Sequence, residues 1–163
     1  MKTKSANILF GFIAGFTLIF YIWMASQIPY THDDWDWGLD LGLQQLFTAN
    51  LNSRYVGNFI VVVLTRSVLL KNLIMGTVLF CIPLMAVKYY QIKNTFNKIL
   101  CFIACNILLL TIEPDIWRQT AGWVSGFSNF MVSAFFIIIY FNIIEELFSD
   151  KSSNIKGWLY IPL

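Results

Sequence analysis

Charged residues are scarce in this sequence. Only 12% of its 163 residues are Asp, Glu, Lys or Arg, whereas 58% are apolar. Soluble domains carry about 25% charged residues, and a chain this short has too much surface for its volume to hide so many apolar side chains in one aqueous core. The shortage of charge therefore excludes a water-soluble fold and predicts an integral membrane protein.

Other features that are typical of soluble enzymes or nucleic-acid-binding proteins are also sparse. The net charge is only +2 and the basic residues do not cluster, so we expect no nucleic-acid partner. The single histidine, His32, cannot form a metal site alone, and neither a Gly-rich phosphate loop nor a Cys-x-x-Cys pair occurs. Three cysteines lie in apolar segments and are interpreted as small hydrophobic residues, not as disulfide or metal ligands: Cys81, Cys101 and Cys105.

Long apolar runs, in contrast, are abundant. A helix needs about 17–25 apolar residues to cross a bilayer, and we interpret four runs as spans, with the start of a fifth: 8–26, 72–90, 98–112, 127–147 and 157–163. The first run has the outline of a signal peptide, but Trp23, Met24 and Ala25 make a poor cleavage site, which favours an uncleaved span. The sequence therefore predicts an all-α, polytopic transmembrane protein forming a single domain over residues 1–163.

The apolar segment Val56–Leu70 is harder to assign because it is short and contains Arg66. Cytoplasmic loops collect Lys and Arg. The connections around Lys93 and Lys151 both become cytoplasmic only if the N-terminus is cytoplasmic and Val56–Leu70 does not cross. We therefore expect this segment to lie on the outer face, as one of one or two interfacial helices in the first outer loop.

The first outer loop opens with an acidic and aromatic element, residues 31–38 (THDDWDWG). Continued as a helix, it places Asp36 and Asp40 on one face and aromatic and aliphatic residues on a neighbouring stripe, which is typical of an interfacial helix. Two adjacent carboxylates can hold a divalent cation such as Mg²⁺ or Mn²⁺, or one of them can serve as a base. Asp33 and Asp34 are therefore candidate catalytic residues and possible metal ligands. The alternative is that they are solvated acids beside a span.

The second outer loop places acidic, cationic and amide side chains close together: Glu113, Asp115, Arg118 and Gln119. The chain has only three arginines, and all three fall on the predicted outer side, against the usual bias: Arg54, Arg66 and Arg118. A guanidinium can grip a phosphate or diphosphate group bidentately. The alternative is that each arginine pairs with a nearby aspartate or an anionic lipid headgroup, and the sequence does not decide between them.

Three short motifs together resemble a known family. They are Asp33–Trp35, Asn52–Tyr55 and Arg118–Trp123, and they follow a short basic start and one span. In this order they resemble the N-terminal part of polytopic bacterial membrane proteins related to GT-C glycosyltransferases, and more narrowly a glucosyltransferase-like group. The resemblance covers nearly the whole chain but only the first part of such a protein. It implies that the chain is a fragment of a larger fold or needs a partner chain.

The resemblance also implies an activity, namely sugar transfer from a polyprenyl-phosphate-linked donor at the outer face of the bacterial plasma membrane. In that family, Asp33 or Asp34 would act as general base or metal ligand. The positive charge of Arg54 and Arg118, not a family motif, makes them candidates for binding the donor phosphate. The remaining candidate substrate-binding residues are Asp36, Tyr55, Glu113, Asp115 and Gln119. Two alternatives remain open: a non-catalytic membrane subunit for lipid-linked glycan transport or envelope assembly, and a small structural protein.

Overall fold

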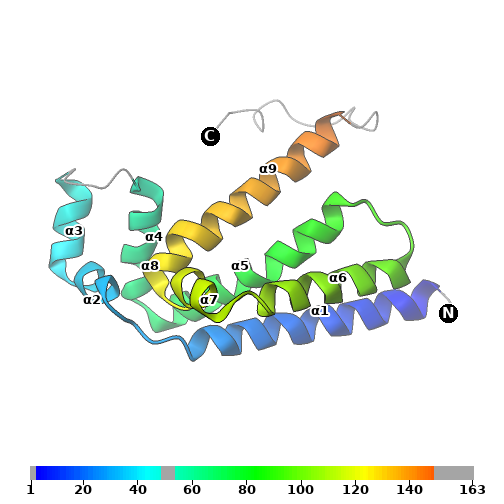
Figure 1. Ribbon diagram of the computed structural model, residues 1–163, viewed down its shortest axis with the longest axis horizontal. Helices are drawn as coiled ribbons and strands as arrows, with labels where there is room; N and C mark the ends of the chain where they lie inside the picture. Colours follow the sequence, from blue (N-terminus) through cyan, green and yellow to red (C-terminus); the bar gives the residue numbers. More distant parts are fainter. Residues whose placement is uncertain (1–2, 49–53, 149–163) are drawn as a thin grey trace.

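The computed structural model describes residues 3–48 and 54–148, and in these ranges every regular element is a helix (Figure 1). The elements follow one another as α1 (Thr3–Ser26), α2 (Asp33–Gly38), α3 (Asp40–Phe47), α4 (Tyr55–Thr65), α5 (Val68–Tyr89), α6 (Thr95–Leu110), α7 (Pro114–Thr120), α8 (Val124–Gly126), the π-helix η1 (Phe127–Met131) and α9 (Val132–Phe148). The prediction of an all-α protein is confirmed for the described residues.

Three helices in the described ranges are long and apolar enough to cross a membrane: Lys4–Ser26, Val68–Tyr89 and Val124–Phe148. They correspond to the first, second and fourth predicted spans and confirm the prediction of a membrane protein. The third predicted span corresponds to α6, whose 16 residues reach only about 24 Å at about 1.5 Å per residue, short of a hydrocarbon core of about 30 Å. Helix α6 is bent by 91° from α7, so a fourth span stays a prediction. The fifth run, 157–163, lies outside the described residues.

The long helices pack side by side. Helix α5 is central and contacts α1, α6 and α9, while α6 also contacts α1. The N-terminus, the α5–α6 connection and the end of α9 lie at one end of the molecule, at the right in Figure 1. The short helices α2, α3, α4, α7 and α8 gather at the opposite end, which we call the loop end. Both predicted outer loops thus share one end, although which side of a membrane it faces stays a prediction.

A close contact between two long helices joins α1 to α5 at Gly76. A Cβ atom on Gly76 would lie 2.6 Å from the Cα of Ile22. Small residues let membrane helices approach this closely, and packing drives their association where lipid is as apolar as the side chains. Tyr21, Met75 and Leu79 are fully buried beside this crossing.

Buried polar side chains add cross-links between the long helices. The hydroxyl of Tyr21 in α1 donates a hydrogen bond of 2.8 Å to the Oδ1 of Asn106 in α6. The Nδ2 of Asn142 in α9 donates to the carbonyl of Met85 in α5 at 3.1 Å. Because hydrocarbon offers polar groups no partners, such pairs fix how the helices are rotated against each other.

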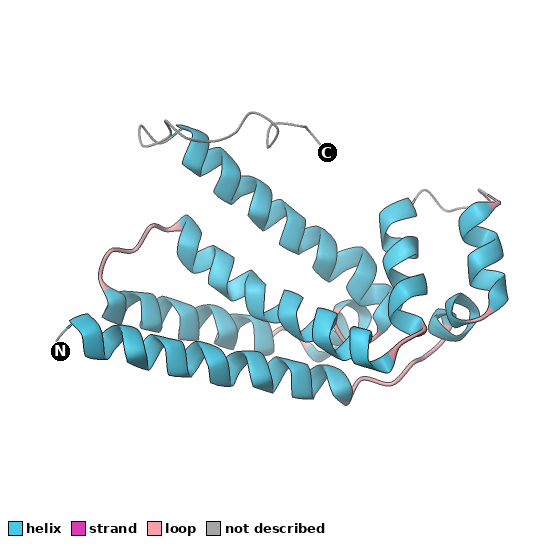
Figure 2. Cartoon of the chain, turned by 180° about the vertical axis from the view of Figure 1, so that it is seen from behind, coloured by secondary structure: helices cyan, strands magenta, loops and turns pink. Residues whose placement is uncertain are grey.

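The loop end departs from the predicted helix pattern. We expected one continuous helix through Asp36 and Asp40, but the backbone is extended at Leu39 (φ −90°, ψ 176°) and separates α2 from α3. We also expected a helix over Val56–Leu70, but α4 ends at Thr65, and a turn at Arg66 starts α5 at Val68. In the described part of this connection, three short helices stand between α1 and α5 instead of one or two. Helix α4 runs across the direction of α1 (Figure 2).

Substitution of Gly76 by Ala is expected to destabilise the bundle, because its methyl group would push α1 away from α5. Overpacking of this kind costs about 1–3 kcal/mol, measurable as a lower melting temperature in detergent micelles. Gly15→Ala is the matched control, because nothing lies within 4 Å of a Cβ at that site. Equal melting temperatures for the two variants would contradict the close crossing.

Candidate functional site

The two predicted outer loops meet at the carboxylate of Asp34, which is 1% exposed. Its Oδ1 accepts hydrogen bonds from the backbone N–H of Ser125 at 2.9 Å and from the Ser125 hydroxyl at 2.6 Å. Its Oδ2 accepts from the N–H of Thr31 at 3.1 Å and from that of Val124 at 3.3 Å. The first N–H groups of a helix have no partner within the helix. Asp34, from a distant part of the chain, provides the acceptor for the first N–H groups of the long helix Val124–Phe148.

A buried cation lies in the same region. Lys71, in the first turn of α5, is 3% exposed. Its Nζ donates to the carbonyl of Ile28 and lies 5.0 Å from the ring centre of Tyr30. The hydroxyl of Tyr30 in turn donates to the carbonyl of Leu64 at 3.0 Å. Burial, together with the negative charge of Asp34, raises the pKa of Tyr30 above its usual value of 10.0, so the phenol remains a hydrogen-bond donor at neutral pH.

Arg66 closes the break between α2 and α3. Its guanidinium donates to the carbonyls of Trp37 and Leu39, each at 2.9 Å, and to that of Val62 at 2.8 Å. The last carbonyls of a helix lack partners within the helix, and Arg66 satisfies carbonyls on two helices. This role accounts for the break at Leu39 and for a cation at this position.

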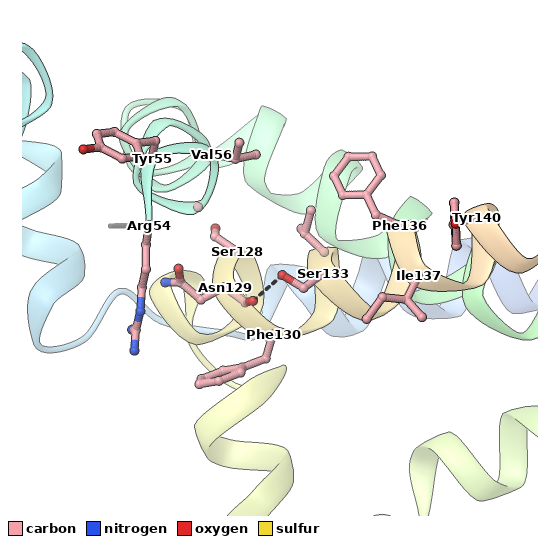
Figure 3. A pocket seen from close by; sticks show the side chains of 12 residues that line it. Arg54, Tyr55, Val56, Ser128, Asn129, Phe130, Ser133, Phe136, Ile137 and Tyr140 are labelled. Atoms are coloured by element: carbon pink, nitrogen blue, oxygen red, sulfur yellow. Dashed lines mark hydrogen bonds between the residues drawn. The ribbon is translucent and has the colours of Figure 1, made fainter. Parts of the chain in front are cut away.

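A cavity of about 740 Å³ lies beside the Asp34 contact, between the start of α4 and the helix that runs through η1 into α9 (Figure 3). Its lining residues are Arg54, Tyr55, Val56, Gly57, Ser128, Asn129, Phe130, Val132, Ser133, Phe136, Ile137 and Tyr140. In Figure 3, Arg54 and Asn129 lie at one end, while Phe136, Ile137 and Tyr140 follow α9 away from it. The cavity is thus polar and cationic at one end and apolar along the other.

Local hydrogen bonds fix the polar end of the cavity. The Nδ2 of Asn129 donates to the carbonyl of Ser125 at 2.8 Å, and the hydroxyl of Ser133 donates to the carbonyl of Asn129 at 2.7 Å. A Cβ atom on Gly57 would lie 2.3 Å from the Oδ1 of Asn129, so a larger residue at this position would displace the Asn129 amide. The π-helical turn Phe127–Met131 carries this asparagine, and π-turns inside α-helices occur frequently at functional sites.

The predicted site residues separate into two groups. Arg54 and Tyr55 line the cavity. The predicted acidic residues do not line it. Asp34 is buried, whereas Asp33 and Asp36 in α2 and Asp115 in α7 are exposed.

The predicted residues of the second loop make local contacts in α7. The carboxylate of Glu113 accepts from the N–H of Ile116 at 2.9 Å, which caps α7. Arg118 pairs with Asp115 at 2.5 Å, with both side chains well exposed. Gln119 is exposed, and its backbone carbonyl accepts from the indole N–H of Trp123 at 2.7 Å. Of the three arginines, Arg54 is thus the one whose side chain has no acceptor within residues 3–48 and 54–148.

The described residues fit a divalent cation poorly. No group of three or more His, Cys, Asp or Glu side chains within the described ranges is placed to hold a metal ion. The carboxylate of Asp34 already accepts four hydrogen bonds, which matches the roughly four acceptor positions of a carboxylate. Metal binding by Asp33 and Asp34 stays a prediction that no observed geometry supports.

The sequence reasoning missed the residues that complete the site. Ser125, Ser128, Asn129 and Ser133 contact Asp34 or line the cavity. Their spacing of three to four residues was a readable signal, because it places polar side chains along one face at the start of an apolar helix. The predicted span began at Phe127, so this polar face was divided between a loop and a span.

Comparison of the chain with family models, curated proteins and solved structures finds no match. The resemblance to GT-C glycosyltransferases therefore stays a prediction.

Substitution of Arg66 by Ala is expected to loosen the loop end, because it leaves carbonyls of two helices without their donor. Hydrogen bonds to a charged group contribute about 1.5–3 kcal/mol, so the melting temperature in micelles should fall clearly. Arg118→Ala removes the same charge from an exposed ion pair, which contributes about 0–1 kcal/mol. An equal loss in both variants would show that the Arg66 contacts do not stabilise the fold.

Proposed function

We propose that this chain binds a polyprenyl-phosphate-linked sugar at its loop end and takes part in GT-C-type sugar transfer at the outer face of a bacterial plasma membrane. The observation that carries the proposal is the cavity between α4 and α9, with one arginine at its polar end and an apolar wall along a membrane-spanning helix. A lipid-linked phosphate has the same division between an anionic head and a long apolar tail.

The apolar wall suits a ligand that enters from the bilayer. Phe136, Ile137 and Tyr140 line the cavity and are 42%, 55% and 54% exposed. On a helix that crosses a membrane, these exposed faces contact lipid tails, and a prenyl chain would exchange with a lipid chain at little cost in solvation.

The polar end suits a phosphate. The guanidinium of Arg54 is not used by another described residue, unlike those of Arg66 and Arg118. The amide of Asn129 and the hydroxyl of Ser133 lie at the same cavity. Charge-assisted hydrogen bonds from arginine to phosphate are short and about twice as strong as neutral ones, so Arg54 would set the position of the head group.

Sugar transfer would follow from this placement. The oxygen of an acceptor hydroxyl attacks the anomeric carbon, the bond from that carbon to the phosphate oxygen breaks, and the hydroxyl proton passes to a carboxylate. Arg54 would stabilise the negative charge left on the phosphate. Asp33 is the better candidate base, because it is exposed at the loop end, whereas Asp34 is buried with its four acceptor positions in use.

A second function is favoured by one observation. None of the acidic side chains of the described residues lines the cavity. Such a cavity is sufficient for a chain that binds the lipid-linked sugar but does not catalyse its transfer. This is the non-catalytic role in transport of lipid-linked glycans or envelope assembly.

Replacement of Arg54 by Gln is expected to weaken binding of a fluorescent polyprenyl monophosphate to the purified chain in micelles about tenfold, because a charge-assisted contact is lost. Arg118→Gln is the matched control and should bind as the unchanged chain does, since Arg118 pairs with Asp115 away from the cavity. Equal affinities for the Arg54 variant and the control would reject the cavity as the phosphate site.

Replacement of Asp33 by Asn separates the two functions. If the chain catalyses transfer, this variant should keep lipid binding and lose sugar addition at the cell surface by about 100-fold or more, as expected for a lost general base. Unchanged sugar addition, together with loss of it in Arg54→Gln, would favour the non-catalytic role.

A further inference from the structure

We infer that Asp34 is a positioning residue, whose carboxylate holds the first turn of the membrane-spanning helix Val124–Phe148 and thereby sets the shape of the polar end of the cavity. The inference deepens the proposed function and rests on it for the identity of the ligand. It assigns Asp34 a role different from that of base or metal ligand.

The first step is the fit between the carboxylate and its donors. The two oxygens of Asp34 accept four hydrogen bonds. Two come from the backbone N–H groups of Val124 and Ser125 at the start of the helix Val124–Phe148, one from the Ser125 hydroxyl, and one from the N–H of Thr31. An asparagine in the same place would turn an NH₂ group toward backbone donors on one side. A carboxylate is therefore the side chain that satisfies all four donors in a buried site.

The second step connects these donors to the cavity. The hydroxyl of Ser128 donates to the carbonyl of Val124 at 2.8 Å, and the amide of Asn129 donates to the carbonyl of Ser125 at 2.8 Å. Val124 and Ser125 therefore donate their N–H groups to Asp34, while their carbonyls accept hydrogen bonds from Ser128 and Asn129, which line the cavity.

The third step is the contact across the cavity. Asn129 lies against Gly57 at the start of α4, with no room for a Cβ atom between them. A shift of the first helical turn would therefore be passed to the wall formed by α4. Arg54 and Tyr55 belong to that same wall, so the contact joins Asp34 to the position of the proposed phosphate ligand.

The position of Asp34 in the chain agrees with this role. Thr31 and Asp34 lie in the first loop, whereas Val124 and Ser125 follow α7. The carboxylate is thus a cross-link between two loops. Asp33, the adjacent acid, makes none of these contacts and remains exposed.

The experiment measures amide hydrogen exchange of the full chain in detergent micelles, followed by mass spectrometry of peptides. In Asp34→Asn we expect exchange in the peptide covering 124–131 to become about tenfold faster, while α1 and α5 stay as protected as in the unchanged chain. Asp33→Asn is the matched control, with the same loss of charge one residue away, and should leave exchange unchanged.

A second variant keeps the inference testable if Asp34→Asn does not fold. Ser125→Ala removes only the hydroxyl donor, so exchange over 124–131 should rise by about threefold. Unchanged exchange over 124–131 in Ser125→Ala would overturn the inference. Where Asp34→Asn does fold, the effect of Ser125→Ala should shrink in the double variant, because both changes break one interaction, and full additivity would also overturn the inference.

Binding of the fluorescent polyprenyl monophosphate provides the functional measurement. Asp34→Asn should weaken this binding more than Ser125→Ala does, and Asp33→Asn should leave it unchanged. A base would show the opposite pattern, with binding and exchange unchanged in Asp34→Asn and only transfer lost. Unchanged exchange over 124–131 in Asp34→Asn overturns the positioning role. If the unchanged chain fails to bind the probe while exchange responds as expected, the proposed ligand is wrong and the positioning role of Asp34 is upheld.

Discussion

The buried carboxylate of Asp34 is the contact on which the loop end depends. A membrane-spanning helix satisfies its own backbone hydrogen bonds except at its ends, and the helix Val124–Phe148 begins with two buried residues, Val124 and Ser125. Asp34 meets that need from another loop, because its carboxylate accepts from the N–H groups of Val124 and Ser125. The same two oxygens also accept from the Ser125 hydroxyl and from the N–H of Thr31. The helix Val124–Phe148 therefore has a fixed start, and the π-turn Phe127–Met131 within it has a fixed place beside α4.

The three arginines show how one residue type takes different roles in this fold. Arg66 satisfies carbonyls at a break between helices, Arg118 forms an exposed pair with Asp115, and Arg54 lines the cavity. The positive-inside tendency would disfavour all three on an outer face. The structure explains Arg66 by backbone hydrogen bonds. The Arg54 side chain has no acceptor among the described residues and lines the cavity, which is why the proposed phosphate site rests on it.

The long helices were the most predictable part of the fold. Spans at 8–26, 72–90 and 127–147 agree with α1, α5 and the helix through α9, because hydropathy over a long window is a local property of the sequence. Boundaries and breaks were less predictable. The break at Leu39 depends on Arg66, which lies 27 positions away. Likewise α4 ends at Thr65 although the apolar run continues, because Ser67 caps a new helix with a 3.3 Å bond from the N–H of Leu70.

The sequence by itself determined that this protein belongs in a membrane, that it is helical, and that acidic and arginine side chains gather in two connections. These properties follow from composition and from runs of neighbouring residues. Only the tertiary structure decided which of the two adjacent aspartates is buried. It also decided that polar residues near the start of the helix Val124–Phe148 line a cavity together with Arg54. Asp34 and Ser125 are 91 positions apart. A hydrogen bond over that separation exists only once the helices between them have packed.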